Sequence, residues 1–194
     1  MTPWQQFVER WKDCRACPLF ESRQNIVLAR GELPCDVLFV GEAPGQSEDV
    51  LGKPFVGPAG QLLDQIIDEA VSSNGRPIRL AWTNLVCCIP LDEHGSKTEA
   101  PSDVSIRTCS ERLVEFVGIA NPRLIVCVGA LATDWLNSRK LRGIKFERSV
   151  EMIDIVHPAA LLRANEVQKS MGVRRSVVQI RNAVKRMLAN ATTR

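Results

Sequence analysis

The chain has 194 residues, of which 45% are hydrophobic, and this length and composition suit one compact domain over residues 1–194 rather than two large ones. It contains no apolar run near the ~18 residues that a membrane-spanning helix needs, and residues 1–6 lack the charged and then apolar pattern of a signal peptide. We therefore expect a cytoplasmic protein with no membrane segment. The net charge of +3 permits a polyanionic partner without requiring one, because such partners respond to clustered charge.

Apolar side chains at helical spacing in residues 4–11 predict an N-terminal helix, which leads directly into Cys14 and Cys17. The chain has seven cysteines, an odd number that cannot pair completely, and a reducing cytosol disfavours disulfides, so some thiols are expected to bind metal. The C-x-x-C spacing can bend two thiolates onto one metal, and Cys88 and Cys109 could complete a set of four. Spacing alone leaves three interpretations open, which are a zinc site, an iron–sulfur cluster and a set of buried apolar cysteines.

Four short apolar runs rich in β-branched residues predict strands, at residues 36–41, 80–86, 124–129 and 152–156. Each run is continuous rather than alternating, which is typical of strands covered on both faces. Segments with helical periodicity lie between them, around residues 62–70, 113–120 and 131–136. The pattern predicts a parallel α/β sheet with helices on both sides.

Three further cysteines fall at or near these runs. Cys35 and Cys127 lie at or inside predicted strands and are interpreted as buried apolar residues. Cys87 adjoins Cys88, and the side chains of adjacent strand residues point to opposite faces. We therefore expect only one of these two thiols to reach a metal site.

Polar residues follow the predicted strands at the point where each strand ends. The first run leads into Gly41 and Glu42, the second contains Asn84 near its end, and the fourth is followed by His157. Ligands of open parallel sheets collect beyond the carboxyl ends of the strands, so we expect a carboxylate, an amide and an imidazole to converge there. The alternatives are an exposed turn carboxylate at Glu42 and a structural histidine at His157.

Two phosphate-binding motifs are excluded. Residues 41–45 (Gly-Glu-Ala-Pro-Gly) are not G-x-G-x-x-G, and Pro44 removes a backbone donor that a phosphate cradle would use. Residues 95–98 (Gly-Ser-Lys-Thr) lack a glycine directly before Lys97 and are not a Walker A loop. These two absences argue against dinucleotide and nucleoside triphosphate binding.

The glycine- and proline-rich segment 53–60 predicts a loop that carries an aromatic side chain, Phe55. Phe55 fits either the core or a platform that stacks on a planar ligand. Asn84 could add two complementary hydrogen bonds to an amide-like edge, which favours a planar heterocycle as the ligand.

Residues 90–103 lack an apolar period and predict a long loop, of the kind that often carries function. Beyond Arg163 the chain is its most basic, with Glu166 as the only acid. The cationic residues there are Lys169, Arg174, Arg175, Arg181, Lys185, Arg186 and Arg194. This stretch is interpreted either as a surface for a polyanion or as a solvated helix face.

Taken together, these motifs resemble the family 4 uracil-DNA glycosylases, the iron–sulfur branch of the uracil-DNA glycosylase superfamily, and the resemblance covers nearly the whole chain. The segments that carry it are 14–17 (Cys-x-x-Cys), 41–45, 48–49 (Glu-Asp), 52–60 (Gly-Lys-Pro-Phe-Val-Gly-Pro-Ala-Gly), 83–84 (Thr-Asn) and 157–163 (His-Pro-Ala-Ala-Leu-Leu-Arg). The resemblance implies a three-layer α/β/α sandwich with a four-stranded parallel sheet, in a single domain that includes a basic C-terminal helix over residues 163–194.

The resemblance also implies a [4Fe-4S] cluster, with ligands at Cys14, Cys17, Cys88 and Cys109. Cys88 is preferred to Cys87 because it takes the place of the family's cysteine in Lys-Cys-Arg-Pro. Here the corresponding residues 87–90 are Cys-Cys-Ile-Pro, so two cationic side chains are missing beside the cluster.

The implied activity is the removal of uracil from single- or double-stranded DNA by a monomeric enzyme that leaves an abasic site. The base would be taken out of the stack and bound by Gly41, Ala43, Phe55 and Asn84. In this scheme Phe55 stacks on uracil and Asn84 reads its N3 and O4 edge, whose hydrogen-bond polarity is opposite to that of cytosine.

The catalytic pair implied by the resemblance is Glu42 and His157. His157 would donate to O2 of the departing base, while Glu42 would place negative charge near the sugar and orient water without help, because Ala43 has no group to do so. Together they would stabilise the negative charge on the departing base and the positive charge on the sugar as the N-glycosidic bond breaks.

Leu161 and Leu162 would act as a wedge in the duplex, and Arg163 would anchor a phosphate. The 90–103 loop is longer than expected for the family and contains His94. A related subclass traps the sugar covalently with a loop histidine, so the alternative function is a uracil-DNA-binding or covalent-trapping protein that uses His94 and turns over weakly.

Overall fold

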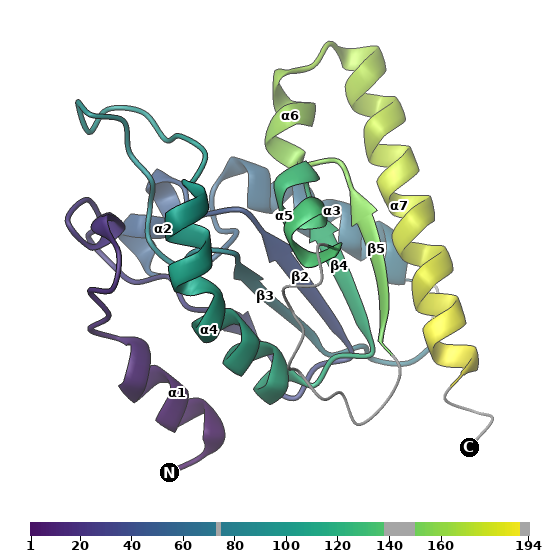
Figure 1. Cartoon of the computed structure of the whole chain (residues 1–194). Helices are drawn as coiled ribbons and strands as arrows, with labels where there is room; N and C mark the ends of the chain where they lie inside the picture. The colour runs from purple at the N-terminus through teal and green to yellow at the C-terminus, as the bar shows by residue number, and fades with distance from the viewer. Residues whose placement is uncertain (73–74, 138–149, 191–194) are drawn as a thin grey trace.

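The computed structural model describes residues 1–72, 75–137 and 150–190. Its centre is a five-stranded sheet with strand order β1-β3-β2-β4-β5 (Figure 1). Four of these strands run parallel, as the sequence predicts, and each lies within one residue of a predicted run or inside it. They are β2 (Val37–Gly41), β3 (Leu80–Asn84), β4 (Leu124–Val128) and β5 (Glu151–Ile155).

The remaining strand, β1 (Arg30–Gly31), pairs antiparallel with β3 at one edge of the sheet. The sheet therefore has one strand more than the four predicted. A strand of two residues that contains a glycine has neither an apolar run nor an alternation that a sequence pattern could reveal. The edge strand carries Arg30, whose side chain donates hydrogen bonds to the backbone of the loop that contains Phe55.

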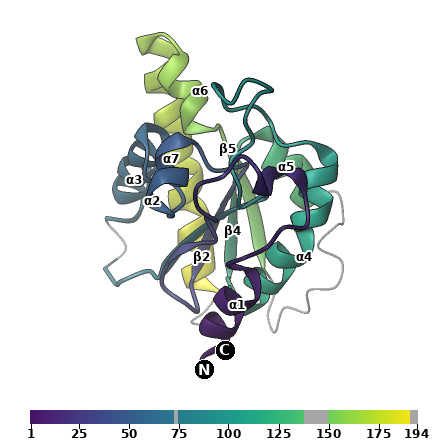
Figure 2. The ribbon, with the colours of Figure 1, turned by 90° about the vertical axis from the view of Figure 1, so that its left-hand side faces the viewer.

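Helices cover both faces of the sheet and form the predicted three-layer sandwich (Figures 1 and 2). One face packs against α3 (Pro58–Val71) and α7 (Glu166–Ala189). The other packs against α1 (Pro3–Trp11), α4 (Asp103–Ala120) and α5 (Ala130–Asn137).

The side chains of β2 alternate between these two layers. Val37 and Phe39 belong to the core on the α3 and α7 side, whereas Leu38 and Val40 belong to the core on the α1 and α4 side. All of β2 is buried, which explains why its sequence is a continuous apolar run. The strand ends are thereby held rigidly in the middle of the molecule.

Three short helices complete the described part of the chain: η1 (Pro18–Phe20), α2 (Gln46–Leu51) and α6 (Pro158–Arg163). The predicted basic helix over 163–194 is divided, since Arg163 ends α6 and Asn165 starts α7 by accepting a hydrogen bond from the Gln168 N–H. Residues 191–194, with Arg194, lie outside the described residues. Among the described residues, no helix combines the length and apolar character needed to cross a membrane.

Candidate active site

Most of the predicted site residues meet in one cavity of about 400 Å³ at the carboxyl ends of the parallel strands. Glu42 directly follows β2, Asn84 ends β3, and His157 comes two residues after β5. Ala43, Phe55 and Arg163 also line the cavity. The convergence expected from the strand ends is thus present in the structure.

Loop 90–103 supplies a wall of the cavity that the sequence analysis did not assign. Thr98, Glu99 and Ala100 line the cavity, and the Glu99 N–H donates to the carbonyl of Pro90 at 2.9 Å. His94 of the same loop does not line it, and the imidazole is exposed beside Glu93. The loop therefore closes one side of the cavity without bringing its histidine in.

Glu42 lies half-buried in the cavity. Burial raises the pKa of its carboxyl above the ordinary value, because the charged form loses hydration. Water screens a half-buried carboxylate less than a fully exposed one, so Glu42 would interact more strongly with positive charge that develops nearby.

His157 is held in one tautomer by the start of α6. Its Nδ1 accepts a hydrogen bond from the Ala159 N–H at 3.2 Å, so the proton of the neutral ring is on Nε2. Burial, helped by the charge of Arg163 and opposed by Glu48, lowers the pKa of His157 and favours the neutral ring. Gly129 lets the ring pack closely, because a Cβ there would lie 3.1 Å from the ring's Cδ2.

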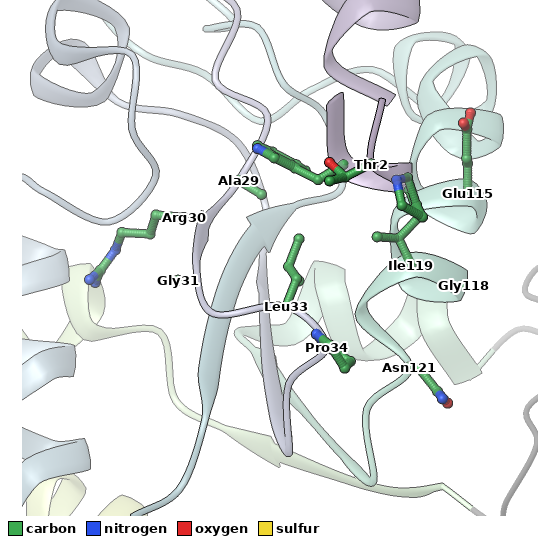
Figure 3. Close-up of a pocket in the computed structure, with 12 residues that line it drawn as sticks. Thr2, Ala29, Arg30, Gly31, Leu33, Pro34, Glu115, Gly118, Ile119 and Asn121 are labelled. Carbon is green, nitrogen blue, oxygen red and sulfur yellow. The ribbon is translucent and has the colours of Figure 1, made fainter. Parts of the chain in front are cut away.

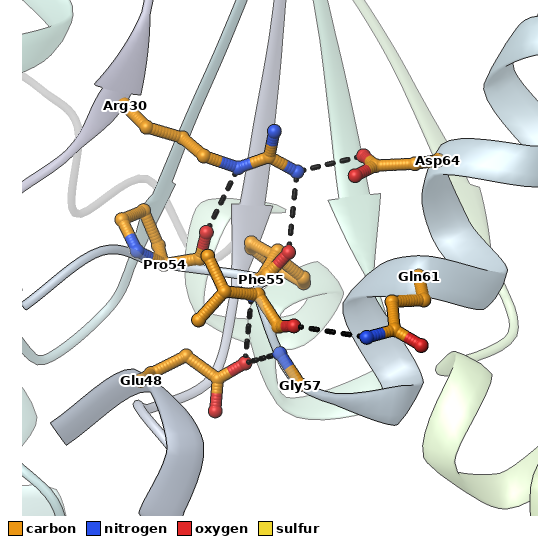
Figure 4. A network of polar contacts seen from close by, with 8 residues as sticks. Arg30, Glu48, Pro54, Phe55, Gly57, Gln61 and Asp64 are labelled. Atoms are coloured by element: carbon orange, nitrogen blue, oxygen red, sulfur yellow. Dashed lines mark hydrogen bonds and ion pairs between the residues drawn. The ribbon is translucent and has the colours of Figure 1, made fainter. Parts of the chain in front are cut away.

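The backbone around Phe55 is fixed by two charged side chains (Figure 4). Phe55 has a φ of 56°, which is unusual for a bulky residue. Arg30 donates from Nε to the Pro54 carbonyl at 2.8 Å and from Nη2 to the Phe55 carbonyl at 3.2 Å. Its Nη2 also reaches Asp64 of α3 at 2.7 Å, and its guanidinium lies 3.9 Å from the centroid of the Trp82 ring.

Glu48 holds the other side of this loop. Its Oε1 accepts from the Val56 and Gly57 N–H groups at 2.9 and 2.7 Å, and its Oε2 accepts from the Gly45 N–H at 3.1 Å. Glu48 thus ties the turn that follows Glu42 to the loop that carries Phe55. Glu48 belongs to a sequence motif of the family, but the motif does not indicate that its carboxylate binds the backbone of two loops.

Gly41 marks the closest approach of the two residues predicted to bind the base. A Cβ at Gly41 would lie 2.5 Å from Oδ1 of Asn84 and 2.5 Å from Cζ of Phe55. Both side chains are nearly buried, at 2% and 7% exposure, and Phe55 packs in the core as well as lining the cavity. Phe55 therefore belongs to the core and also borders the cavity, where a ligand could reach it.

The three residues predicted to contact DNA differ in accessibility. Leu161 is only 5% exposed and packs against Gly172 of α7, where a Cβ would lie 2.4 Å from its Cδ2. Leu162 is 42% exposed. Arg163 borders the cavity mouth. Of the two leucines, only Leu162 has a side chain available to a partner.

The predicted metal ligands surround a second, much smaller pocket beside α1 and α4. Cys14, Cys17, Cys88 and Cys109 all line it, and so does Cys87. The expectation that only one of Cys87 and Cys88 reaches the pocket is wrong, because β3 ends at Asn84 and strand alternation does not extend to these residues. Cys35 and Cys127 are buried elsewhere, as predicted.

Two arginines from other parts of the chain stand beside these thiols. Arg23 donates to Sγ of Cys88 at 3.1 Å, and Arg112 of α4 lies close to Cys109, whose Sγ is 3.7 Å from that of Cys87. The hydrogen bond from Cys87 lowers the pKa of Cys109, and the charge of Arg112 adds to this effect against the opposing effect of burial. Residues 87 and 89 carry no positive charge beside Cys88, but Arg23 and Arg112 bring two positive charges to the pocket from other parts of the chain.

These cysteines supply the ligand type that an iron–sulfur cluster uses. All the metal-ligating side chains that line the pocket are thiols, the ligands that such clusters use. Among the described residues, no three Cys, His, Asp or Glu side chains are grouped closely enough to hold one ion. A cluster distributes its cysteines over several irons and does not require three thiols on one atom.

A larger cavity, of about 810 Å³, lies apart from both sites (Figure 3). It is lined by the start of α1, the β1 segment and α4, with Thr2, Leu33, Pro34 and Ile119 among its residues. None of the predicted site residues borders it. Size alone therefore does not identify the functional site of this protein.

Comparison with known proteins supports the resemblance on which these expectations rest. Residues 29–179 match the uracil DNA glycosylase superfamily. The chain is 33% identical over 187 residues to the type-4 uracil-DNA glycosylase of Pyrobaculum aerophilum, covering 87% of this chain and 91% of the relative. It is 36% identical over 171 residues to the type-4 uracil-DNA glycosylase of Thermotoga maritima, covering 83% and 85%. Sequence, fold and site thus agree, and the chain belongs to the type-4 uracil-DNA glycosylases of the uracil DNA glycosylase superfamily.

Proposed function

We propose that this enzyme removes uracil from DNA by hydrolysing the N-glycosidic bond of a nucleotide that has been flipped out of the stack. The observation that carries the proposal is that Glu42, Phe55, Asn84 and His157 line one cavity at the carboxyl edge of the sheet. The cavity volume of about 400 Å³ is within the range of small-molecule sites and can admit a single base. A duplex cannot enter it, so the base must leave the stack.

Recognition of uracil falls to Phe55 and Asn84. The ring of Phe55 stacks on the base, and the Asn84 amide accepts from N3–H and donates to O4. Cytosine presents the opposite polarity at these two positions, which would leave buried polar groups unpaired. Ala43 lines the cavity with a small side chain, and Gly41, which does not line it, leaves room for the side chains of Asn84 and Phe55.

The chemistry falls to His157 and Glu42. As the bond from C1′ to N1 breaks, its electron pair leaves with uracil, and Nε2–H of His157 donates to the O2 that gains negative charge. The Glu42 carboxylate faces the positive charge that develops on the sugar and orients the water that adds to C1′. The water that adds to C1′ gives up one proton and the uracil anion takes up one, so the products are free uracil and an abasic site.

DNA contact is proposed for the segment that follows His157. Leu162 is exposed and takes the wedge role, whereas the buried Leu161 holds α6 against α7. Arg163 at the cavity mouth would bind a backbone phosphate, and the basic side chains of α7 would extend this contact. We propose that the enzyme acts as a monomer on single- or double-stranded DNA.

We further propose that Cys14, Cys17, Cys88 and Cys109 hold a [4Fe-4S] cluster. When bound, the cluster would supply thiolate–iron bonds that join the N-terminal segment, the end of β3 and α4. The residues that bind and cleave line a different cavity, so base removal is assigned to the chain's own side chains.

The two histidines of the chain give a matched test. An oligonucleotide with one uracil is incubated with the enzyme, treated with alkali and examined for strand cleavage, beside oligonucleotides with thymine, hypoxanthine or xanthine. We expect cleavage at uracil, a loss of roughly 10²–10³ in kcat in His157→Ala, and no change in His94→Ala. An intact uracil strand would refute the proposal. A denaturation-resistant adduct that disappears in His94→Ala would instead support covalent trapping.

A further inference from the structure

Arg112 is a fully buried arginine in α4 that the function proposed above does not use. It is 0% exposed and is the largest fully buried side chain among the described residues. Burying a guanidinium is costly unless its charge and its donors are matched. The acceptors and negative groups around Arg112 therefore indicate the role of this side chain.

On one side, Arg112 fixes the backbone at the end of β3. Its Nη2 donates to the Asn84 carbonyl at 2.6 Å and to the Leu85 carbonyl at 2.9 Å. Its Nη1 donates to Oγ1 of Thr83 at 2.8 Å, and this hydroxyl donates in turn to the Leu28 carbonyl at 2.8 Å. The guanidinium thus holds the main chain on which the Asn84 side chain is mounted.

On the other side, Arg112 faces the thiols of the cysteine pocket. Cys109 lies three residues earlier on the same helix, so the two side chains share one face of α4. The charges that favour its ionised state are those of Cys109, Cys87 and Cys88. Among the described residues, its Nε has no hydrogen-bond partner. Burial opposes the ionised state, and the negative groups that offset this cost are the nearby thiols, which raise the pKa of Arg112.

We propose that Arg112 is a positioning residue for base recognition, which places Asn84 through its backbone and is itself placed by the thiolates of the cysteine pocket. The charge of the cysteine thiolates and the binding of uracil in the active-site cavity are then coupled through the Arg112 side chain. The inference rests on the proposed function, because it assigns Asn84 to uracil and the thiols to a cluster.

Coupling between the cysteine pocket and the active-site cavity can be measured without following turnover, from the reduction potential of the cluster and the affinity for uracil. If the two sites are coupled, uracil binding changes the reduction potential of the cluster, and the cluster state changes uracil affinity by the same factor. The potential is measured on cluster-loaded protein with and without saturating free uracil. We expect a shift on uracil addition in the wild type, and its loss in Arg112→Met.

Arg23→Met is the matched control. Arg23 also presents a cation to the pocket, through Sγ of Cys88, but it makes no hydrogen bond to Asn84 or Leu85. Both methionine variants should lower the reduction potential itself, because each removes a positive charge beside the cluster. Only Arg112→Met should raise KM for uracil-containing DNA and the Kd for uracil, by roughly tenfold, with a smaller change in kcat.

Arg112→Lys separates charge from geometry and provides a second test if Arg112→Met does not fold. Lysine keeps the cation but cannot reach two carbonyls and a hydroxyl as a planar fork. We expect the potential to stay near the wild-type value while KM rises. The proposal is overturned if uracil leaves the wild-type potential unchanged, if KM is unaffected in both Arg112 variants, or if Arg23→Met raises KM equally. A wild type that leaves uracil in DNA would refute the proposed function instead.

Discussion

At the scale of single residues, the carboxyl of Glu42 links burial to reactivity. Burial raises its pKa above the ordinary 4.5, while its proposed role requires the charged form. We therefore expect kcat/KM to fall as the pH drops through this raised pKa, giving an acid limb with a midpoint above 4.5. Glu42→Gln should lower kcat by roughly 10²–10³ and abolish the limb, as measured in pH–rate profiles of uracil release.

Glu93→Gln is the control for this profile. Glu93 is an exposed carboxylate on loop 90–103 that does not line the cavity. This variant should retain both the limb and the wild-type rate. If the acid limb persisted in Glu42→Gln, the titrating group would be another residue, and the role given to Glu42 would be wrong.

Sequence reasoning found Glu42, Asn84 and His157 because each lies at or just after the end of a strand, and strand ends of a parallel sheet share one edge. It could not find the tautomer of His157, which depends on the position of the Ala159 N–H after α6 has formed. It also missed Arg112, because an arginine on an amphipathic helix normally faces water. Its burial is visible only when α4 lies against the end of β3.

At the scale of elements, the loop that carries Phe55 depends on the edge strand β1. Arg30→Lys keeps a cation near Asp64 but cannot donate to the Pro54 and Phe55 carbonyls together. We expect the free energy of unfolding to fall by about 1–3 kcal/mol, since about two hydrogen bonds of a charged donor are lost. KM for uracil-containing DNA should rise as well, because the Phe55 ring loses its fixed position.

Asp64→Asn provides the comparison. It removes the ion pair with Arg30 and leaves both carbonyl hydrogen bonds possible. Thermal unfolding and steady-state kinetics of the two variants should therefore differ, with KM near the wild-type value in Asp64→Asn. Equal increases in KM would show that the ion pair, rather than the contacts to the loop backbone, positions Phe55.

The elements themselves were predictable where burial imposes a long pattern. β2, β3 and β4 are buried along nearly their whole length because helices cover both faces of the sheet. The expectation of full burial is wrong for β5, which lies at the sheet edge and is buried only at Ile155. β1 has two residues and no such pattern. Strand alternation does not apply to Cys87 and Cys88, because the chain leaves the sheet after Asn84. Where a strand ends depends on its neighbours in the fold as well as on its own residues, so the sequence does not reveal it.

At the scale of the whole molecule, the cysteine pocket joins the N-terminal segment to the rest of the chain. α1 is held by its own core contacts, since Phe7 is fully buried and stacks with Trp4 and packs against Phe116. The segment after it has no comparable apolar anchor up to η1, and its attachment falls to Cys14 and Cys17. The proposed cluster would therefore have a local task that the core does not perform.

Cys14→Ser should release the segment after α1 while leaving α1 itself in place. We expect loss of the broad absorption near ~400 nm that marks thiolate-ligated iron, together with tryptic cleavage between residues 12 and 23 that is at least about tenfold faster. α1 should stay docked through Phe7, so the helix content should change little. Cys127→Ala, which removes a buried thiol outside the pocket, should keep both the absorption and the wild-type cleavage pattern. Equal protection of the 12–23 segment in Cys14→Ser would show that packing alone holds it and that the cluster has no part in its attachment.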